Sequence, residues 1–178
     1  MRMLRVIAIF MLVATGIAWA QGNNPVVEAH AVMSTDAAHA NSTVKLAVLA
    51  QVQNGYHIND HKPSLDYLIP TALKVDPSDQ FTVKDVVYPK GTPVKFAFSD
   101  LPLSVYQGDV TLGVVLQSAK AVSVGSYPLK AKLSYQACND HACLPPASVP
   151  LTVTIKVVPR SVPLKSNEPN IFQRIKFE

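Results

Sequence analysis

Two cysteines carry the thiol chemistry of this sequence. Cys138 and Cys143 have four residues between them, in the run YQACNDHACLPP at 135–146. Two thiols at this spacing, at the tip of an expected strand-turn-strand, can close a small disulfide ring. In the chain-entropy model a ring of about six residues contributes only roughly 2 kcal/mol, against about 4.7 kcal/mol for a hundred-residue loop. The position therefore favours a disulfide that opens and closes for a partner over one that serves stability.

His141 lies between the cysteines and offers two further kinds of chemistry. With Cys138 and Cys143 it could contribute three ligands to a metal, but a closed zinc site needs four. An imidazolium next to a thiol lowers the thiol pKa and makes the thiol more reactive. We expect no metal here, and we expect His141 either to be solvated or to stabilise a thiolate.

His57 and His61 have the four-residue spacing of a metal-binding pair on a helix. Gly55, Asn59 and Pro63 make a helix improbable in this segment. On an extended segment the two side chains would stand too far apart for easy chelation of one ion. We therefore expect both histidines to be loop or strand-end residues.

Short apolar segments with the two-residue period of β-strands recur along the chain. The clearest is VKLAVLAQVQ at 44–53, which the turn signal Asn54-Gly55 follows. The sequence contains 14 prolines, and no stretch keeps a helical period for three turns. Strands at this spacing predict an all-β fold, an immunoglobulin-like β-sandwich. The expected strands are 44–53, 67–75, 81–88, 110–117, 128–135 and 149–158.

The beginning of the chain has the pattern of a secretory signal. Arg2 and Arg5 precede an apolar run at 6–17 and the small-residue cleavage pattern AWA at 18–20. The run is shorter than the about 20 residues that a membrane span needs, so cleavage is favoured over a retained anchor. The predicted division is a signal peptide at 1–20, a flexible N-terminal segment at 21–42, the sandwich domain at 43–158 and a C-terminal tail at 159–178, which either docks on the sandwich or trails in solution.

Length and charge limit the possible partners. The mature chain is long enough for one domain with a proper core. Without Arg2 and Arg5 it carries 14 basic and 12 acidic residues. This balance, with no basic cluster that alternates with aromatic residues, argues against nucleic acid as a partner. Export into an oxidising compartment permits a disulfide, and we expect the bacterial periplasm.

The motifs together resemble the N-terminal periplasmic domain of DsbD, the thiol:disulfide interchange protein of Gram-negative bacteria. The resemblance covers roughly residues 26–158. It rests on the combination of YQAC at 135–138 with CLPP at 143–146, and on the earlier runs GYHI at 55–58, HKP at 61–63 and YLIPT at 67–71.

The resemblance implies an immunoglobulin-like domain that accepts two electrons from a thioredoxin-like donor linked to a membrane electron transporter. The acceptor would be a periplasmic disulfide isomerase or a cytochrome c maturation thioredoxin. By the same analogy, Cys143 attacks the partner's disulfide and Cys138 resolves the mixed intermediate, which agrees with the general scheme of thiol–disulfide exchange. No metal and no small-molecule cofactor is required.

In this family an aromatic ring on a loop caps the disulfide. The corresponding segment here is KFAFSD at 95–100, in which we expect Phe98 to be the cap and Phe96 to be the alternative. A plain β-strand, with one ring buried and one exposed, is the other interpretation. The acidic pair that flanks the ring in the best-known members is missing on this alignment.

Without those carboxylates, proton transfer to the thiols needs another group. The family alignment places Tyr56, His57 and Asn59 near the positions of active-site tyrosines. His57 is therefore a candidate to donate or accept the proton, although it could equally be a loop or strand-end residue. Tyr135 is expected to shape the cysteine hairpin and not to react.

The predicted function is that of a periplasmic protein-disulfide reductase module. DsbD continues into a membrane domain and a second thioredoxin-like domain, whereas this sequence stops at Glu178. We therefore expect a stand-alone version, or a fragment, that receives electrons from another protein. Two alternatives remain open. One is a non-enzymatic envelope-binding module with a disulfide that stays shut, and the other is a copper-handling protein that uses Cys138 and Cys143, because thiolates suit Cu(I).

Overall fold

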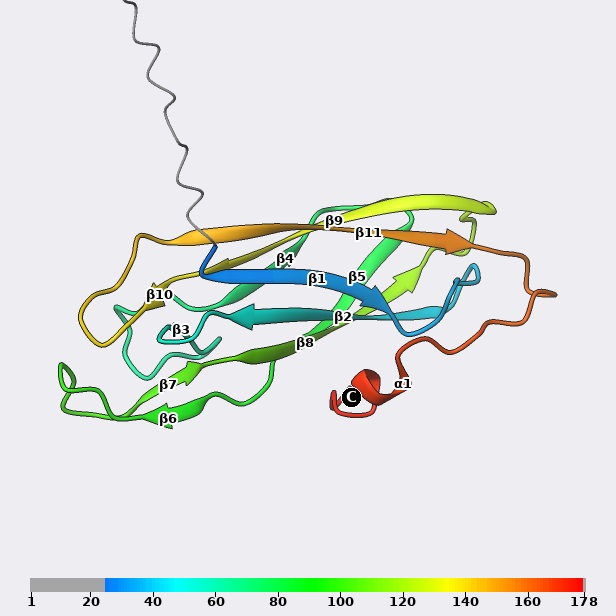
Figure 1. Cartoon of the computed structure of the whole chain (residues 1–178). Coiled ribbons are helices and arrows are strands. Elements are labelled where there is room, and N and C mark those ends of the chain that lie inside the picture. The colour runs from blue at the N-terminus through cyan, green and yellow to red at the C-terminus, as the bar shows by residue number, and fades with distance from the viewer. Residues whose placement is uncertain (1–24, 178) are drawn as a thin grey trace, which may run out of the picture.

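The computed structural model describes residues 25–177, which form two stacked antiparallel sheets and a smaller third sheet at one end (Figure 1). The first sheet has the order β1 (Val27–Met33), β2 (Thr43–Val52), β8 (Asp109–Ser118), β5 (Phe81–Val87). The second has the order β11 (Ala147–Val157), β9 (Gly125–Tyr135), β4 (Ala72–Val75). The third has the order β10 (Ala137–Cys138), β3 (His57–Asn59), β7 (Leu103–Tyr106), β6 (Thr92–Val94). The predicted all-β, immunoglobulin-like sandwich is confirmed.

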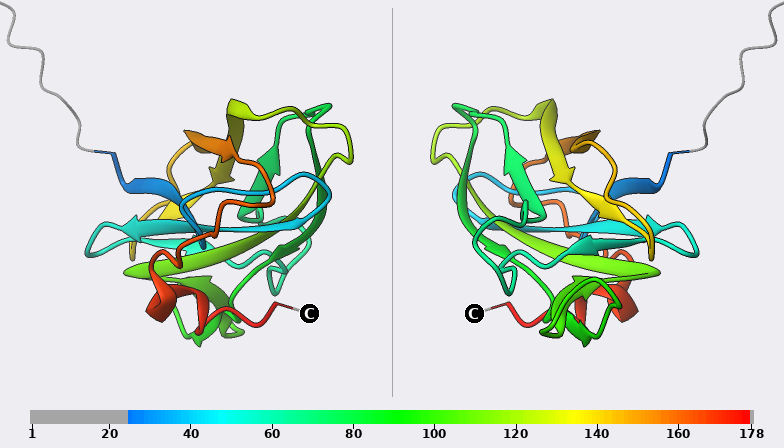
Figure 2. Two further views of the ribbon diagram at one scale, coloured as in Figure 1. Left: turned by 90° about the vertical axis from the view of Figure 1, so that its right-hand side faces the viewer. Right: turned by 90° about the vertical axis from the view of Figure 1, so that its left-hand side faces the viewer.

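The core lies between the first two sheets, which Figure 2 shows end-on as two layers. Successive side chains of a strand point to opposite faces, so an apolar residue at every second position gives each sheet one apolar face. The buried residues follow this period. The first sheet contributes Leu46, Val48, Leu112, Val114 and Leu116, and the second contributes Leu129, Leu133, Leu151 and Ile155.

The first strand is a correction to the predicted flexible segment at 21–42. Strand β1 lies inside that segment and pairs with β2 along its whole length, from Val27 opposite Val52 to Met33 opposite Leu46. The strand was missed because its outward residues, Glu28 and His30, alternate with small ones, and the apolar signal is weak. The signal peptide predicted at 1–20 lies outside the described residues.

The expected strand at 67–75 is too long. Strand β4 begins only at Ala72, and residues 60–71 form a loop. The strands expected at 44–53, 81–88, 110–117, 128–135 and 149–158 are present as β2, β5, β8, β9 and β11, although β9 begins three residues earlier. Strands β3, β6, β7 and β10 have two to four residues each, too few to show a period.

The third sheet is made from continuations of the sandwich strands. Strand β9 runs on past Tyr135 into β10, and Gly55 and Gly108 form the corners that lead from β2 into β3 and from β7 into β8. Both glycines have positive φ angles, of 82° and 60°, a conformation that costs glycine little. These corners bring β3 and β10 side by side at one end of the molecule.

The C-terminal tail docks on the outer face of the first sheet. Gly113 and Ala47 are cross-strand partners on that face, and a Cβ atom at Gly113 would lie 2.7 Å from both Ile175 Cγ2 and Phe177 Cε1. The Nζ atom of Lys45 lies 4.7 Å from the Phe177 ring centroid, within cation–π distance. The short helix α1 (Pro169–Phe172) lies beneath β2 and β8 in Figure 1.

Among residues 25–177, no helix has the length and apolar character needed to cross a membrane.

Candidate functional site

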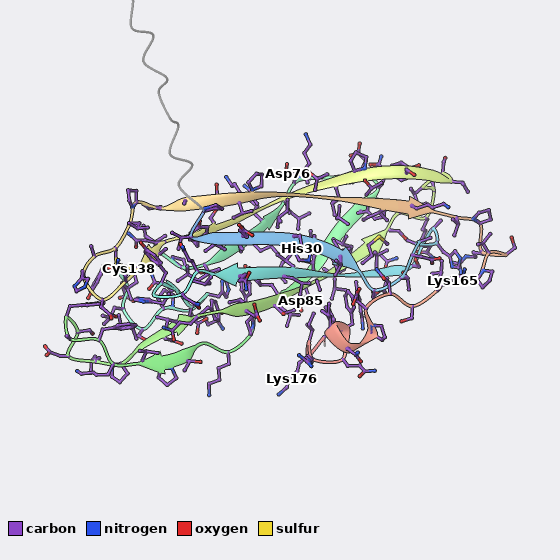
Figure 3. All side chains as sticks on the ribbon, viewed as in Figure 1. His30, Asp76, Asp85, Cys138, Lys165 and Lys176 are labelled. Carbon is purple, nitrogen blue, oxygen red and sulfur yellow. A yellow bond between two sulfur atoms is a disulfide. The ribbon has the colours of Figure 1, made fainter. Side chains whose placement is uncertain are left out.

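Cys138 and Cys143 form a disulfide at the end of the molecule that carries the third sheet (Figure 3). Their Cα atoms are 3.9 Å apart, and the two residues face each other as an isolated antiparallel bridge. The two cysteine residues differ sharply in their exposure to solvent. Cys138 is only 2% exposed, whereas Cys143 is exposed to solvent. A partner protein can therefore reach Cys143 more readily than Cys138.

Asn139 closes the turn between the two cysteines. Its side-chain Oδ1 accepts hydrogen bonds from the backbone N–H groups of His141 and Ala142, both at 2.9 Å. Its own N–H donates to the carbonyl oxygen of Ala142 at 3.0 Å, and Leu144 N–H donates to the carbonyl oxygen of Ala137 at 2.8 Å. An asparagine that bonds the backbone two residues on is a common turn device. The hairpin thus holds the disulfide on an ordered turn.

His57 lies directly opposite Cys138 in the third sheet. In the antiparallel pairing of β3 with β10, Cys138 is the partner of His57 and Ala137 is the partner of Ile58. Directly opposed side chains share one face of a sheet, with Cβ atoms about 4.5–5.5 Å apart. Ile58 and Ala137 belong to the main core, so His57 and Cys138 point to the other face.

That other face is covered by a second, smaller apolar cluster. Phe96, Leu103 and Val105 form it, with Leu65, Leu68 and Val94 packed around them. The Phe96 ring stacks on the His57 ring with the centroids 4.2 Å apart, and the Phe98 ring stacks on Phe96 at 5.2 Å. Phe96 is 6% exposed and Phe98 is 54% exposed. Phe96, the alternative cap in the sequence analysis, is therefore the ring in contact with His57, and Phe98 lies one ring further out.

Burial and one carboxylate set the protonation of His57. The side chain is 2% exposed, and this burial lowers its pKa from the ordinary 6.5, while the negative charge of Asp140 opposes the shift. The imidazole is therefore neutral at pH 7 in the oxidised protein. His141, the other histidine of the site, is exposed on the hairpin.

Tyr135 and Tyr56 lie beside the cysteine hairpin, along one groove. Tyr135 is buried, and burial raises the pKa of its hydroxyl although a hydrogen bond from the backbone of Val27 acts in the opposite direction. A groove of about 650 Å³ runs along this side of the hairpin, and both tyrosines line it with Val26, Leu144 and Pro145. The two tyrosines thus form part of the groove wall next to the hairpin.

Asn59 anchors the loop at 60–71. Its Nδ2 donates to the carbonyl oxygen of Ile69 at 2.9 Å, and its own carbonyl oxygen accepts a hydrogen bond from Thr71 Oγ1 at 2.6 Å. Asn59 and Thr71 are almost completely buried. Asn59 thus holds the loop that supplies Leu65 and Leu68 to the smaller cluster.

His57 and His61 do not face the same site. His61 stacks on Tyr88 with the ring centroids 3.7 Å apart, and its Nδ1 lies 3.2 Å from the carbonyl oxygen of Thr71. Residues 25–177 include no group of three or more His, Cys, Asp or Glu side chains placed to hold a metal ion.

A polar network around Asp60, at the end of strand β3, was not predicted from the sequence. Asp60 Oδ1 accepts a hydrogen bond from the Tyr106 hydroxyl at 2.6 Å, and its Oδ2 accepts hydrogen bonds from Ser104 Oγ at 2.7 Å and from Gly91 N–H at 3.3 Å. Burial alone would raise the pKa of Asp60, but these hydrogen bonds and one from Lys62 N–H outweigh it and lower the pKa. Gly91, Ser104 and Tyr106 lie 31 to 46 residues from Asp60 in sequence, so no local sequence pattern predicts the network.

The fold and the site together define a class of protein. Its members are immunoglobulin-like sandwiches that carry a disulfide at one end, with one cysteine exposed and the other buried. The family described as "Thiol:disulfide interchange protein DsbD, N-terminal" matches residues 23–154. The chain belongs to this family. The comparison with curated proteins found no match.

Several solved structures are similar to this chain. The reduced form of the Neisseria meningitidis DsbD N-terminal domain is 22% identical, with a TM-score of 0.42, and the match covers 70% of this chain and 86% of that one. The same domain in complex with the PilB N-terminal domain from that organism is 24% identical, with a TM-score of 0.40, over 68% and 80%. A type I cohesin from Pseudobacteroides cellulosolvens is 12% identical, with a TM-score of 0.44, over 79% and 97%.

Proposed function

We propose that this protein is a periplasmic thiol:disulfide reductase module. It relays two electrons from a thioredoxin-like donor, linked to a membrane electron transporter, to oxidised thioredoxin-fold proteins such as a disulfide isomerase or a cytochrome c maturation thioredoxin. The observation that carries this proposal is the unequal exposure of the two disulfide-bonded cysteines, in a chain of the DsbD N-terminal family. The protein would be an oxidoreductase with no cofactor of its own.

The exchange follows from the positions of the two sulfurs. In the reduced protein the Cys143 thiolate attacks one sulfur of the acceptor's disulfide, and the other acceptor sulfur leaves as a thiolate. A mixed disulfide now joins Cys143 to the acceptor. The Cys138 sulfur then attacks Cys143, the intrachain disulfide forms again, and the acceptor leaves with two thiols. The donor reverses these steps and restores the two thiols of this protein.

The experiment that tests this proposal is covalent trapping. The mature chain with Cys138→Ala cannot resolve the mixed disulfide, so oxidised thioredoxin-fold acceptors of a periplasmic extract should stay attached to Cys143 until a reductant is added. The matched control is Cys143→Ala, which should capture far less because Cys138 is buried. Equal capture by the two variants would contradict the assigned roles, and no capture by either would contradict the exchange function.

A measured reduction potential separates this function from a disulfide that stays shut. Structural disulfides of secreted proteins lie below about −300 mV, and labile ones lie higher. We expect a value above that threshold from equilibration with glutathione or dithiothreitol. A value far below it, together with failed reduction by a thioredoxin-fold donor, would favour the non-enzymatic binding module.

The periplasmic location has its own test. Expression of the full chain and N-terminal sequencing of the protein in the periplasmic extract should give Gln21 as the first residue. An unprocessed protein in the cytoplasmic fraction would contradict both the location and the cleavage.

A further inference from the structure

Cys138 sits in the backbone register between two other reactive residues. On one side it faces Cys143 across the isolated bridge, and on the other it faces His57 across the β10–β3 pairing. Strand β10 is at the edge of the third sheet and pairs there with β3 alone. His57 is therefore the residue that the sheet places directly opposite Cys138.

The resolving step needs a proton acceptor at this place. Cys138 must become a thiolate before its sulfur can attack, and a thiol in apolar surroundings ionises reluctantly. Cys138 is 2% exposed, so solvent has poor access to it. A base on the same face of the sheet would remove the proton where solvent does not reach.

His57 has the properties that this role requires. Stacking on Phe96 fixes the ring, and burial lowers the pKa so that the imidazole is neutral and able to accept a proton at pH 7. Asp140 on the hairpin is the charged group that acts on the ring, and its negative charge favours the imidazolium once it forms. Lys95, the cation of the cap segment, turns to its own loop, where its Nζ donates to the carbonyl oxygens of Ser99 and Asp100.

We propose that His57 accepts the proton of the Cys138 thiol when Cys138 resolves the mixed disulfide. This inference rests on the proposed exchange function. The proton moves from Cys138 Sγ to the imidazole as the new Cys138–Cys143 bond forms and the bond from Cys143 to the acceptor breaks. The departing acceptor thiolate then takes a proton from the imidazolium or from solvent. When the donor reduces the disulfide, the His57 imidazole first takes up a proton from the attacking donor thiol or from solvent, and it then passes this proton to the departing Cys138 thiolate.

A small aromatic disulfide separates the two steps. Reduced mature protein, mixed with dithiobis(nitrobenzoate), releases one coloured thiolate when Cys143 attacks and a second when Cys138 closes the ring. We expect His57→Gln to slow the second release by on the order of a hundredfold at neutral pH, the usual worth of a general base, and to leave the first unchanged. The loss should shrink as the pH rises, because hydroxide then removes the thiol proton. His30→Gln, at an exposed position on strand β1 and outside the site, is the matched control and should change neither step.

Asp140→Asn gives a second test that does not disturb a buried position, since Asp140 is exposed. The wild-type rate of the second release should fall as the pH drops through the pKa of His57, because an imidazolium cannot accept a proton. Asp140 raises that pKa, so its removal should move the midpoint of this fall to lower pH. Circular dichroism establishes that each variant is folded. If His57→Gln does not fold, the shift of the pH midpoint in Asp140→Asn tests the role of His57 by itself.

The outcomes distinguish this inference from the function on which it rests. A folded His57→Gln protein with wild-type rates and pH profile, or an unmoved midpoint in Asp140→Asn, would overturn the role of His57 and leave the exchange function standing. A wild-type protein that releases only one coloured thiolate would show that Cys138 does not resolve, and both proposals would fail.

Discussion

The ring of Phe96 lies nearly flat against the ring of His57, with the centroids 4.2 Å apart and the planes inclined by 24°. This stack joins the segment between β6 and β7 to the strand that faces Cys138. A loop that caps a disulfide needs such an attachment, because an exposed ring alone has little to hold it in place. The contact therefore makes Phe96 the residue through which the loop is held near the site.

Replacing Phe96 should loosen this attachment. We expect Phe96→Ala to lower the free energy of unfolding by about 3 kcal/mol, as for other buried phenylalanines. It should also speed the alkylation of Cys138 in the reduced protein, because His57 and its neighbours lose their cover. Urea unfolding and mass spectrometry after timed iodoacetamide treatment measure the two effects. Phe98→Ala is the matched control, since Phe98 is 54% exposed and should cost less than about 1 kcal/mol. A larger effect from Phe98→Ala on both measurements would make Phe98 the cap.

The unequal exposure of the cysteines should appear directly in their reactivity. In the reduced wild-type protein we expect Cys143 to react with iodoacetamide roughly tenfold faster than Cys138 or more, because thiol reactivity follows access and ionisation. Peptide mapping after brief labelling gives the two rates. Urea-unfolded protein is the control, in which the rates should converge. Equal rates in the folded protein would mean that the asymmetry disappears on reduction.

The Asp60 network should make stability depend on pH in a defined direction. The native pKa of Asp60 lies below its ordinary value of 3.8, so its stabilising effect is present above that value and is lost as the pH falls through the native pKa. Urea unfolding of the wild type between pH 7 and pH 2 should show this loss. In Asp60→Asn the stability should be lower at pH 7 and should change less over the acidic range. If the unfolding free energy of both proteins depends on pH in the same way, Asp60 is not the source of the acid sensitivity.

The hydroxyl of Tyr106 offers a separate test of the same network. It donates to Asp60 and, at 2.9 Å, to the carbonyl oxygen of Pro89. Tyr106→Phe keeps the packing and removes these bonds, together with the one that the hydroxyl accepts from His61 N–H. We expect it to cost about 1–3 kcal/mol of unfolding free energy, because a hydrogen bond to a charged carboxylate is stronger than one between neutral groups. Tyr127→Phe is the control, since its hydroxyl bonds only to Ser123 at an exposed position. A cost below that of the control would show that the network contributes nothing.

Gly113 should be required for docking of the C-terminal tail. A Cβ atom there would meet Ile175 and Phe177 at 2.7 Å, so Gly113→Ala should displace the tail and expose the chain beyond residue 170 to proteases. Gly125→Ala is the matched control, because its Cβ atom would meet only ordinary contacts at 3.5 Å or more. Limited proteolysis and urea unfolding measure the effect.

The same contact predicts non-additive effects. Removal of residues 171–178 should destabilise the wild type more than it destabilises Gly113→Ala, because the substituted protein has already lost the contact. Additive effects of the two changes would mean that Gly113 and the tail act independently.

The sequence alone predicted the sheets with long apolar faces. Strands β2 and β8 alternate apolar residues over ten positions each, and such a period can bury its side chains in only one way. The turn at Asn54-Gly55 and the cysteine hairpin were also legible, because asparagine and glycine favour turns locally. Strand β1 was not, since its place depends on pairing with β2 and not on its own residues.

What the sequence determined by itself is the pair of thiols, its family and the sandwich that carries it, because residue type, spacing and period are local properties. Only the tertiary structure decided which cysteine is buried, which ring lies on His57 and where the tail docks. Those facts depend on the corners at Gly55 and Gly108, which place β3 and β10 together, and on contacts between residues far apart in the chain. Burial and pairing of this kind are properties of the assembled fold, and no short segment encodes them.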